Sequence, residues 1–339
     1  MQALLYPEFG RIEYATVPDP PAPRADEVTL RVAACGICGS ELEAFRRHSP
    51  RCPPPLVLGH EFCGVIERVG EDVLGWRRGD RVVSNSLVPC GGCVRCRRGD
   101  SHLCRTRQIF GMNRPGAFAE WVNVPARCLL RWPPSLSEEE ACLAEPLANG
   151  IHIVNLTKAL PAEYALVVGA GAIGLFCQQA LQVLRGAKVV VADLSDERLA
   201  VAKRLGAAYT INPRRADVLS VVRQLTVGEG VDLAVDAVGT SLTKQATVDA
   251  TRPGGATVWI GLQENSVMVD SFGITLSEKR VLGSYAATTD ELRLALELMF
   301  GRKIDAKTWT TRVPLRDAET AFRRALAAKG TDIKMIVCP

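Results

Sequence analysis

The segment from Tyr164 to Val183 limits the folds open to this 339-residue chain more than any other. The apolar run 164–168 leads into Gly169-Ala-Gly171-Ala-Ile-Gly174, and helical apolar spacing follows over 173–183. In a strand–turn–helix unit the first glycine permits the turn, the second admits a pyrophosphate, and the third packs helix on strand. A glycine pattern alone also fits an ordinary turn, but this context predicts the first unit of a dinucleotide-binding fold.

The residues that follow continue the alternation of strand and helix. Strands are predicted at 188–192, 231–238 and 256–261, and helices at 196–205 and 242–251. Continuous apolar strands between helices are typical of an α/β fold with a doubly wound parallel sheet. Asp193, at the end of the second strand, can accept both ribose hydroxyls and would repel the extra phosphate of NADP, which favours NAD.

The first part of the chain has a different pattern. Short β-like runs at 28–34, 65–69, 81–83 and 118–124 alternate with turn signals, which predicts a β-rich domain up to about residue 147. Near the end, helices are predicted at 289–300 and 316–328 and a last strand at 334–337. This pattern divides the chain into a β-rich part over 1–147, an α/β part over 148–285 and a part of mixed elements over 286–339.

The chain has twelve cysteines but only four histidines. The N-terminus lacks a basic region followed by an apolar one, and no apolar run reaches the ~18 residues of a membrane span. We therefore expect a cytoplasmic, reduced chain that has no membrane partner, in which thiols bind metal or pack in the core. The net charge of +4 is too small to indicate a nucleic-acid partner.

Four of the cysteines, Cys90, Cys93, Cys96 and Cys104, have the spacing CxxCxxCx7C. Four thiolates suit a closed, tetrahedral zinc site that staples a lobe and performs no chemistry. An iron–sulfur cluster is the rival, although no proline follows the last cysteine and no second cluster motif occurs. Four unrelated core thiols are a weaker alternative.

A second group of metal-binding residue types lies nearer the N-terminus. Cys38 comes just after a predicted strand, and His60-Glu61 follows 22 residues later. A catalytic zinc needs about three protein ligands and one exchangeable position. Taken singly, Cys38 and His60 could equally be a core thiol and a buried histidine.

The motifs together resemble the zinc-dependent medium-chain alcohol dehydrogenase family. Its zinc signature is matched by Gly59, His60, Glu61, Gly64, Gly70 and Val73. The segment 36–40, the four-Cys lobe, 79–82, 116–120 and the glycine pattern also occur in the family's order. The resemblance covers essentially the whole chain. It implies a GroES-like β-rich catalytic domain over 1–147, a Rossmann NAD-binding domain over 148–285, and a return to the catalytic domain over 286–339. It also implies one catalytic and one structural zinc, and NAD.

The resemblance also implies roles for individual residues. Cys38 and His60 would bind the catalytic zinc, and Glu61 would bind it or orient the site. Glu145, in the Glu-Pro-Leu segment of the polyol-dehydrogenase branch, would be the third ligand, directly or through water; Cys142 is the nearest competing thiol. The cofactor would contact Gly169, Gly171, Ala172, Ile173, Gly174, Asp193, Arg198 and Lys334. Arg198 could instead lie on a solvated helix face, and Lys334 could be a plain surface lysine.

Ser40 matches the family's proton-relay hydroxyl, with a structural serine at a turn as the alternative. The next relay positions depart from the family, because they are Glu41 and Glu43 here. Glu41 could still orient His60, whereas Glu43 could accept a proton or simply be solvated. The basic run Arg46, Arg47, His48 and Arg51 could bind an anionic substrate group or form a solvated loop.

These residues predict zinc-dependent, NAD-linked oxidation of a secondary alcohol in a polyol, sugar or sugar derivative. One alternative is L-threonine 3-dehydrogenase activity, because residues 111–116 resemble a segment of that branch. Another is a zinc- and NAD-binding sensor without activity, although Cys38, His60 and Glu145 are all present. The family pattern implies a homodimer or homotetramer that pairs cofactor-domain sheets near 281–287. The remaining cysteines (Cys35, Cys52, Cys63, Cys128, Cys142, Cys177 and Cys338) are expected to pack in cores.

Overall fold

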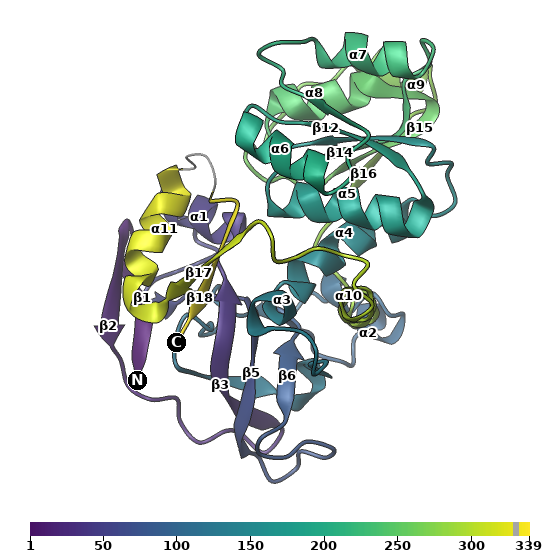
Figure 1. Ribbon diagram of the computed structural model, residues 1–339. Coiled ribbons are helices and arrows are strands. Elements are labelled where there is room, and N and C mark those ends of the chain that lie inside the picture. Colours follow the sequence, from purple (N-terminus) through teal and green to yellow (C-terminus); the bar gives the residue numbers. More distant parts are fainter. Residues whose placement is uncertain (328–331) are drawn as a thin grey trace. The chain divides into compact units, whose positions relative to one another are not determined.

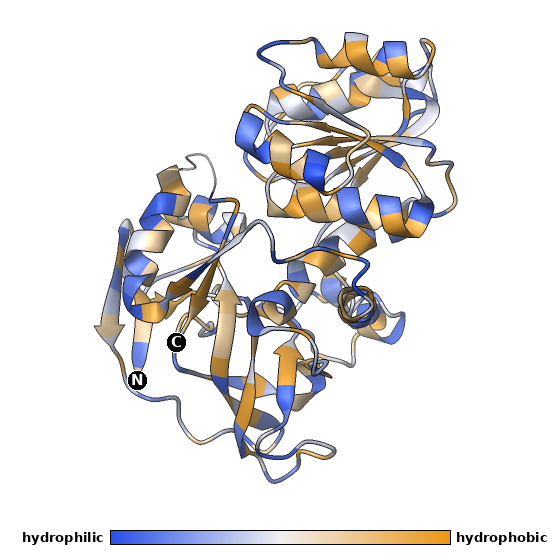
Figure 2. Ribbon diagram, viewed as in Figure 1, coloured by the Kyte–Doolittle hydropathy of each residue, from blue (hydrophilic) through white to orange (hydrophobic). Residues whose placement is uncertain are grey.

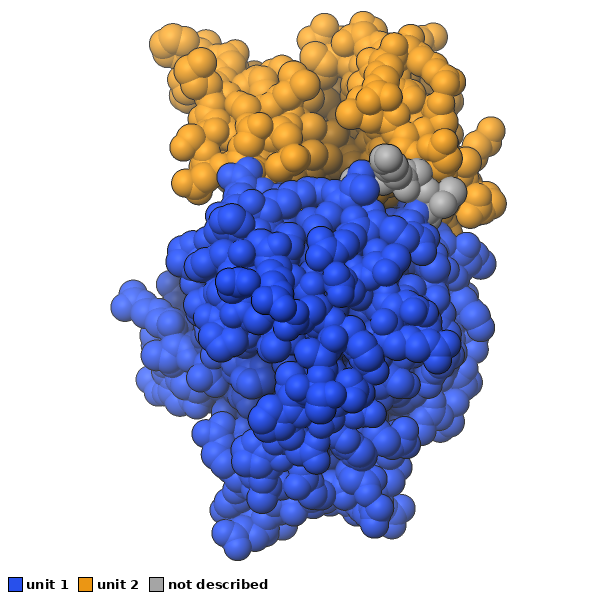
Figure 3. Space-filling view, turned by 90° about the vertical axis from the view of Figure 1, so that its left-hand side faces the viewer, with its two compact units in different colours: residues 1–145, 288–339 blue, residues 146–287 orange. Residues whose placement is uncertain are grey.

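The computed structural model describes residues 1–327 and 332–339. The chain divides into two compact units, one formed by residues 1–145 and 288–339 and the other by residues 146–287 (Figure 3). In the described part of the chain, no helix is both long and apolar enough to cross a membrane.

The unit of residues 146–287 is built on one six-stranded parallel sheet. Its strand order, β13-β12-β11-β14-β15-β16, is that of a doubly wound dinucleotide-binding fold. Figure 1 shows α5 and α6 on one side of this sheet and α7 and α8 on the other. The predicted fold class is confirmed. The strands are β11 (Tyr164–Val168), β12 (Lys188–Ala192), β13 (Tyr209–Ile211), β14 (Val231–Asp236), β15 (Thr251–Trp259) and β16 (Arg280–Gly283). The helices are α4 (Ala144–Leu156, which begins in the other unit), α5 (Ala172–Arg185), α6 (Asp196–Arg204), α7 (Val218–Leu225), α8 (Ser241–Ala250) and α9 (Ser271–Thr275).

The central strands of this sheet, β11, β12 and β14, are mainly apolar because helices cover both faces. Figure 2 shows them in the colours of hydrophobic residues, between helices of mixed character. Strands β11 and β12 have the predicted bounds. Strand β15, predicted from residue 256, begins at Thr251, because Thr251 pairs with Val231 before an irregularity in the register. Pro253, Gly254 and Gly255 therefore lie inside a strand and not in a turn.

The other unit is β-rich, and its largest sheet has the path β10-β6-β5-β3-β18-β17, with β9 paired to β3. The chain's last strand is antiparallel to β3, with Val337 opposite Cys35. Its strands are β1 (Gln2–Glu8), β2 (Arg11–Thr16), β3 (Glu27–Gly36), β4 (Leu56–Val57), β5 (Glu61–Val69), β6 (Arg81–Ser84), β7 (Leu87–Val88), β8 (Gln108–Ile109), β9 (Trp121–Pro125), β10 (Leu129–Arg131), β17 (Thr310–Pro314) and β18 (Lys334–Cys338). Its helices are α1 (Gly39–Arg46), α2 (Val94–Arg97), α3 (Glu138–Cys142), α10 (Thr289–Phe300) and α11 (Ala318–Ala327), with short 3-10 turns at Ser101–Leu103, Ala126–Cys128 and Leu315–Asp317.

Several predicted elements of this unit have other bounds in the structure. The strand predicted at 65–69 begins at Glu61, and the one predicted at 28–34 extends to Gly36. The strand predicted at 118–124 begins at Trp121, because the Phe118 amide donates to Leu58 and not to β3. The helix predicted at 316–328 begins at Ala318, after a 3-10 turn, and Ala328 lies outside the described residues.

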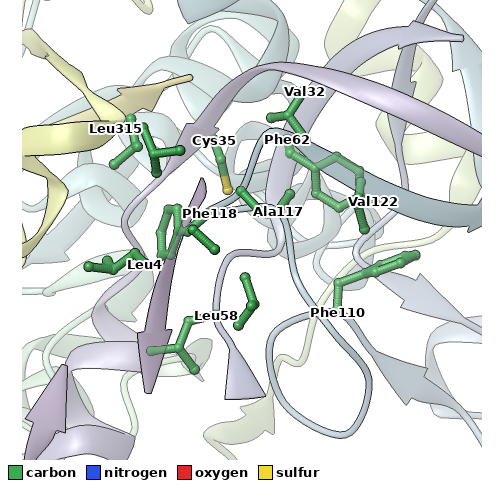
Figure 4. Packing of buried hydrophobic residues seen from close by; sticks show 14 of the residues in the cluster. Leu4, Val32, Cys35, Leu58, Phe62, Phe110, Ala117, Phe118, Val122 and Leu315 are labelled. Carbon is green, nitrogen blue, oxygen red and sulfur yellow. The ribbon is translucent and has the colours of Figure 1, made fainter. Parts of the chain in front are cut away.

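The core of this unit gathers residues from β1, β3, β5 and the chain's last elements. Figure 4 shows Cys35 in this cluster with Phe118, Ala117 and Leu315. The prediction that Cys35 is a core thiol is therefore confirmed. All seven cysteines outside the two metal motifs are buried, and none of the twelve, which all lie in the described residues, forms a disulfide.

Candidate active site

Cys38, His60 and Glu61 come together at the ends of two paired strands. Strand β3 ends at Gly36, Cys38 caps the N-terminus of α1, and Glu61 is the first residue of β5. One ligand atom from each of the three residues lies within 4.8 Å of the others. A thiol, an imidazole and a carboxylate at this separation suit a zinc ion that keeps a further position open.

Glu41 connects the two chain segments that carry these residues. Its carboxylate accepts the amides of Cys38 (3.1 Å) and Gly59 (2.7 Å). Its Oε1 also lies 3.0 Å from His60 Nδ1, so a proton on Nδ1 leaves Nε2 to face a metal. Glutamate therefore takes the orienting position that the sequence left open for it.

The Glu41–His60 contact is buried, since the two side chains are 0% and 7% exposed. Burial alone would lower the pKa of His60, but the Glu41 carboxylate and the Cys38 thiol raise it well above its usual value. The surroundings thus favour positive charge at this ring. The same negative groups would stabilise a metal cation bound at His60 Nε2.

Glu61 has a partner that the sequence did not reveal. Lys334, from the last strand, forms an ion pair with Glu61 Oε2 and donates to the Ile37 carbonyl at 2.8 Å. Lys334 is 3% exposed, so its interpretation as a plain surface lysine is wrong. Burial lowers the pKa of Lys334, but the neighbouring Glu61 carboxylate raises it by more than burial lowers it. The net pKa lies above the usual value, so the lysine stays charged. Its role at a cofactor phosphate stays a prediction.

Glu145 lies close to this group but is not one of its three members. It is half-buried in the first turn of α4, and its Oε1 accepts the hydroxyl of Ser86 at 2.7 Å. Burial raises the pKa of Glu145, and the charges of His60 and Lys334 oppose that rise. Cys142, the competing thiol, is buried and donates to the Glu139 carbonyl.

The other predicted relay and anion-binding residues have local partners. The Ser40 hydroxyl donates to Cys38 Sγ at 3.2 Å. Glu43 pairs with Arg46 and Arg47, two exposed residues of the basic run. Glu43 neutralises one of these two arginine charges, and both arginines are exposed, which favours the solvated-loop interpretation.

The four-Cys lobe also brings its thiols together. Cys90, Cys93, Cys96 and Cys104 offer sulfur atoms that all lie within 4.8 Å of one another. Burial tends to raise the pKa of Cys104, but the Cys90 amide and Thr106 lower it to about 6. Burial and the neighbouring Cys93 thiol raise the pKa of Cys96 to about 12. Four thiolates can coexist here only around a cation, so the donor set fits a structural zinc.

The glycine turn of the other unit has the geometry expected for a phosphate loop. Gly169 has φ +99°, and a Cβ there would meet Val238 at 2.7 Å, whereas Gly171 has open space and caps α5. A Cβ at Gly174 would overlap the Gly169 carbonyl. Asp193 accepts the amides of Ala170 (2.7 Å) and Ser195 (2.8 Å), which ties the second strand's end to the turn. Arg198 is half-buried in α6.

The segment 111–116, which suggested a threonine dehydrogenase, packs against the backbone that leads to His60. A Cβ at Gly111, where φ is +67°, would meet Gly59 N at 2.5 Å. The Gly116 and Ala117 amides donate to the Val57 and Gly59 carbonyls. Arg114 is inside the unit, paired with the buried Glu27 at 3.1 Å. The segment 111–116 therefore holds the backbone next to His60 in place. Its contacts do not indicate which substrate the protein binds.

Replacing Gly116 with alanine should therefore displace the chain around His60. The new Cβ would overlap the carbonyl oxygens of Leu58 and Gly59, both backbone atoms. Overpacking of this kind costs about 1–3 kcal/mol of stability. A shift of the ligand should lower kcat/KM roughly tenfold or more. Gly301→Ala is the control, because Gly301 is exposed and its Cβ would come no closer than 3.3 Å to the nearest atom. Equal melting temperatures and rates for the two variants would contradict this role.

Two family models match the chain. Residues 24–134 match the alcohol dehydrogenase GroES-like domain, and residues 172–301 match the zinc-binding dehydrogenase model. L-threonine 3-dehydrogenase of Pyrococcus horikoshii is 35% identical over 74% of this chain and 73% of its own length. The chain belongs to the zinc-dependent medium-chain alcohol dehydrogenase family. The predicted family is therefore confirmed, and membership favours an enzyme over a non-catalytic sensor.

Two further proteins are similar to nearly the whole chain. A protein named "probable D-xylulose reductase A", from Aspergillus fumigatus, is 30% identical over 94% of this chain and 92% of its own length. A solved structure described as a short chain alcohol dehydrogenase from Escherichia coli CFT073, complexed with NADH, has a TM-score of 0.92. It is 28% identical and covers 100% of this chain and 99% of its own.

Sequence reasoning missed Ser86 and the pairing of Lys334 with Glu61. Ser86 is a single serine between two short strands, with no motif around it. A lysine at the start of a terminal strand likewise gives no sign of burial. Both pairings join residues far apart in the sequence, so only the fold reveals them.

Proposed function

We propose that this protein is a zinc-dependent, NAD-linked dehydrogenase that interconverts a secondary alcohol of a polyol, sugar or sugar derivative with the ketone. The observation that carries the proposal is the grouping of Cys38, His60 and Glu61 within 4.8 Å, with Glu145 hydrogen-bonded nearby. When bound, zinc supplies Lewis-acid chemistry that lowers the pKa of an alcohol. A nicotinamide cofactor held at the glycine turn of Gly169, Gly171 and Gly174 would supply the hydride acceptor.

The chain's own residues account for the remaining steps. Glu41 fixes the His60 ring, and Lys334 holds the Glu61 carboxylate. The Ser40 hydroxyl, 3.2 Å from Cys38 Sγ, would carry the proton that the alcohol releases. Glu43 is held by Arg46 and Arg47, so we assign it no step.

One observation supports NAD as the cofactor. Asp193 lies beside the glycine turn, where a carboxylate accepts ribose hydroxyls and repels a 2′-phosphate. Of the similar solved dehydrogenases, one carries NADH and another NADP, so the choice of NAD rests on Asp193. For the quaternary state we propose a homodimer or homotetramer paired through β16, which ends the sheet in the described residues.

L-threonine oxidation is the second candidate, favoured by the 35% identity to an L-threonine 3-dehydrogenase. The substrate motif that suggested it lies against Gly59, so the identity is its main support.

A substrate panel tests the proposal. The zinc-loaded protein is incubated with sorbitol, xylitol, galactitol, their phosphate esters and L-threonine, each with NAD and with NADP, and NADH or NADPH absorbance is followed. We expect a polyol or its ester to exceed L-threonine at least about tenfold in kcat/KM, with NAD preferred. Faster turnover of L-threonine would select the second candidate. Equal kcat/KM for each polyol and its phosphate would exclude recognition of an anionic group by the basic run.

A further inference from the structure

Ser86 lies at a point of the fold where a polar side chain is unexpected. It stands between β6 and β7 and is 4% exposed. Its hydroxyl donates to Glu145 Oε1 at 2.7 Å, across 59 positions of sequence. This is an ordinary length for a hydroxyl–oxygen hydrogen bond, and a charged acceptor strengthens such a bond.

The backbone around Ser86 is fixed from both sides. Asn85 Oδ1 accepts the Leu87 amide at 2.9 Å, which closes a turn around Ser86. The Asn85 backbone amide donates to the Cys128 carbonyl at 2.8 Å, and the Phe110 backbone amide donates to the Ser86 carbonyl at 3.2 Å. The hydroxyl therefore starts from a backbone with little freedom to move.

The hydrogen bond from Ser86 restricts the orientation of the Glu145 carboxylate. Its electrostatic neighbours are His60, Glu61 and Lys334, which places it beside the metal group. Glutamate has a long side chain with several rotamers, and only one oxygen of the carboxylate is engaged by Ser86. Fixing Oε1 also fixes the direction in which Oε2 points.

We propose that Ser86 is a positioning residue that presents the Glu145 carboxylate to the catalytic zinc in one orientation. The inference rests on the proposed function in one respect, the assignment of Glu145 to that zinc. Residues that hold metal ligands in place typically contribute 10–100-fold to metal affinity. Loss of the Ser86 hydroxyl should therefore lower the zinc affinity of the catalytic site and leave that of the four-Cys lobe unchanged.

The experiment compares Ser86→Ala, Ser86→Thr and Ser84→Ala. Ser84 is a matched control, because it is also a buried serine but donates to the Asn85 carbonyl at 3.0 Å. Each variant is loaded with zinc, and transfer of the metal to a chromogenic chelator is followed. We expect Ser86→Ala to release one zinc equivalent about 10–100-fold faster than wild type. Ser86→Thr should stay within about threefold, and Ser84→Ala should match wild type.

A double-mutant cycle shows whether Ser86 acts through Glu145. In Glu145→Gln, adding Ser86→Ala should change zinc release by less than about twofold, because coupled residues are not additive. Equal release from Ser86→Ala and Ser84→Ala would overturn the proposal, and so would an undiminished Ser86→Ala effect in Glu145→Gln. The readout is metal release and not turnover. Failure of the proposed function would appear instead in the substrate panel of the wild-type protein.

Discussion

Cys38→Ser is expected to lower alcohol-dependent NADH formation by at least about 1,000-fold while one of two zinc ions stays bound. A serine hydroxyl does not ionise near neutral pH, so His60 and Glu61 would remain without the thiolate of their group. A 1,000-fold loss corresponds to about 4 kcal/mol of transition-state stabilisation. Zinc content per chain and kcat/KM on the best alcohol measure the two effects together.

Cys128→Ala is the matched control for this variant. Cys128 is a buried thiol of the same unit, and it lies in the apolar core outside both metal groups. The control should keep both zinc ions and a kcat/KM within a few-fold of wild type. Activity that survives in Cys38→Ser with only the four-Cys lobe loaded would refute the mechanism.

Cys104→Ser should have the second large effect, on stability. Of residues 90–107, all of them described, only His102 and Cys104 are buried, so the lobe has almost no core of its own. Structural zinc then contributes directly to folding. We expect the variant to lose one zinc and about 3 kcal/mol of stability, which lowers Tm by about 6–12 °C.

Trypsin provides a local readout of the same change. Arg95, Arg97 and Arg98 are exposed in the lobe, and cleavage there requires the backbone to open. The variant should be cut between 95 and 98 much faster than wild type, as measured by mass spectrometry of the fragments. Two zinc ions in Cys104→Ser, or iron in the wild-type protein, would contradict a structural zinc in this lobe.

The parallel sheet could be predicted closely because burial on both faces makes its strands continuous apolar runs. Strands β11 and β12 therefore have the predicted bounds. The start of β15 could not be predicted, because Pro253 and two glycines normally signal a turn and only pairing with β14 overrides them. In the β-rich unit, the sequence predicts Phe118 as part of a strand. Its amide instead donates a hydrogen bond to the Leu58 carbonyl.

The candidate site divides in the same way. Cys38, His60, Glu61 and the four-Cys lobe occur in motifs with fixed spacing, so the sequence could name them. Ser86 and the burial of Lys334 depend on contacts between distant segments, which no local pattern records. The role of Glu41 could be suggested but not decided, because the reach of the longer side chain depends on how α1 meets β5.

The Glu41 carboxylate ties the Cys38 and Gly59–His60 segments together through protein groups alone. Two ligands therefore keep their separation before any metal arrives, whereas the lobe of residues 90–107 has short helical turns but only two buried residues, His102 and Cys104. The two zinc ions would thus be acquired differently. One enters as part of folding, and the other can be lost and reloaded on a finished scaffold without the chain having to refold.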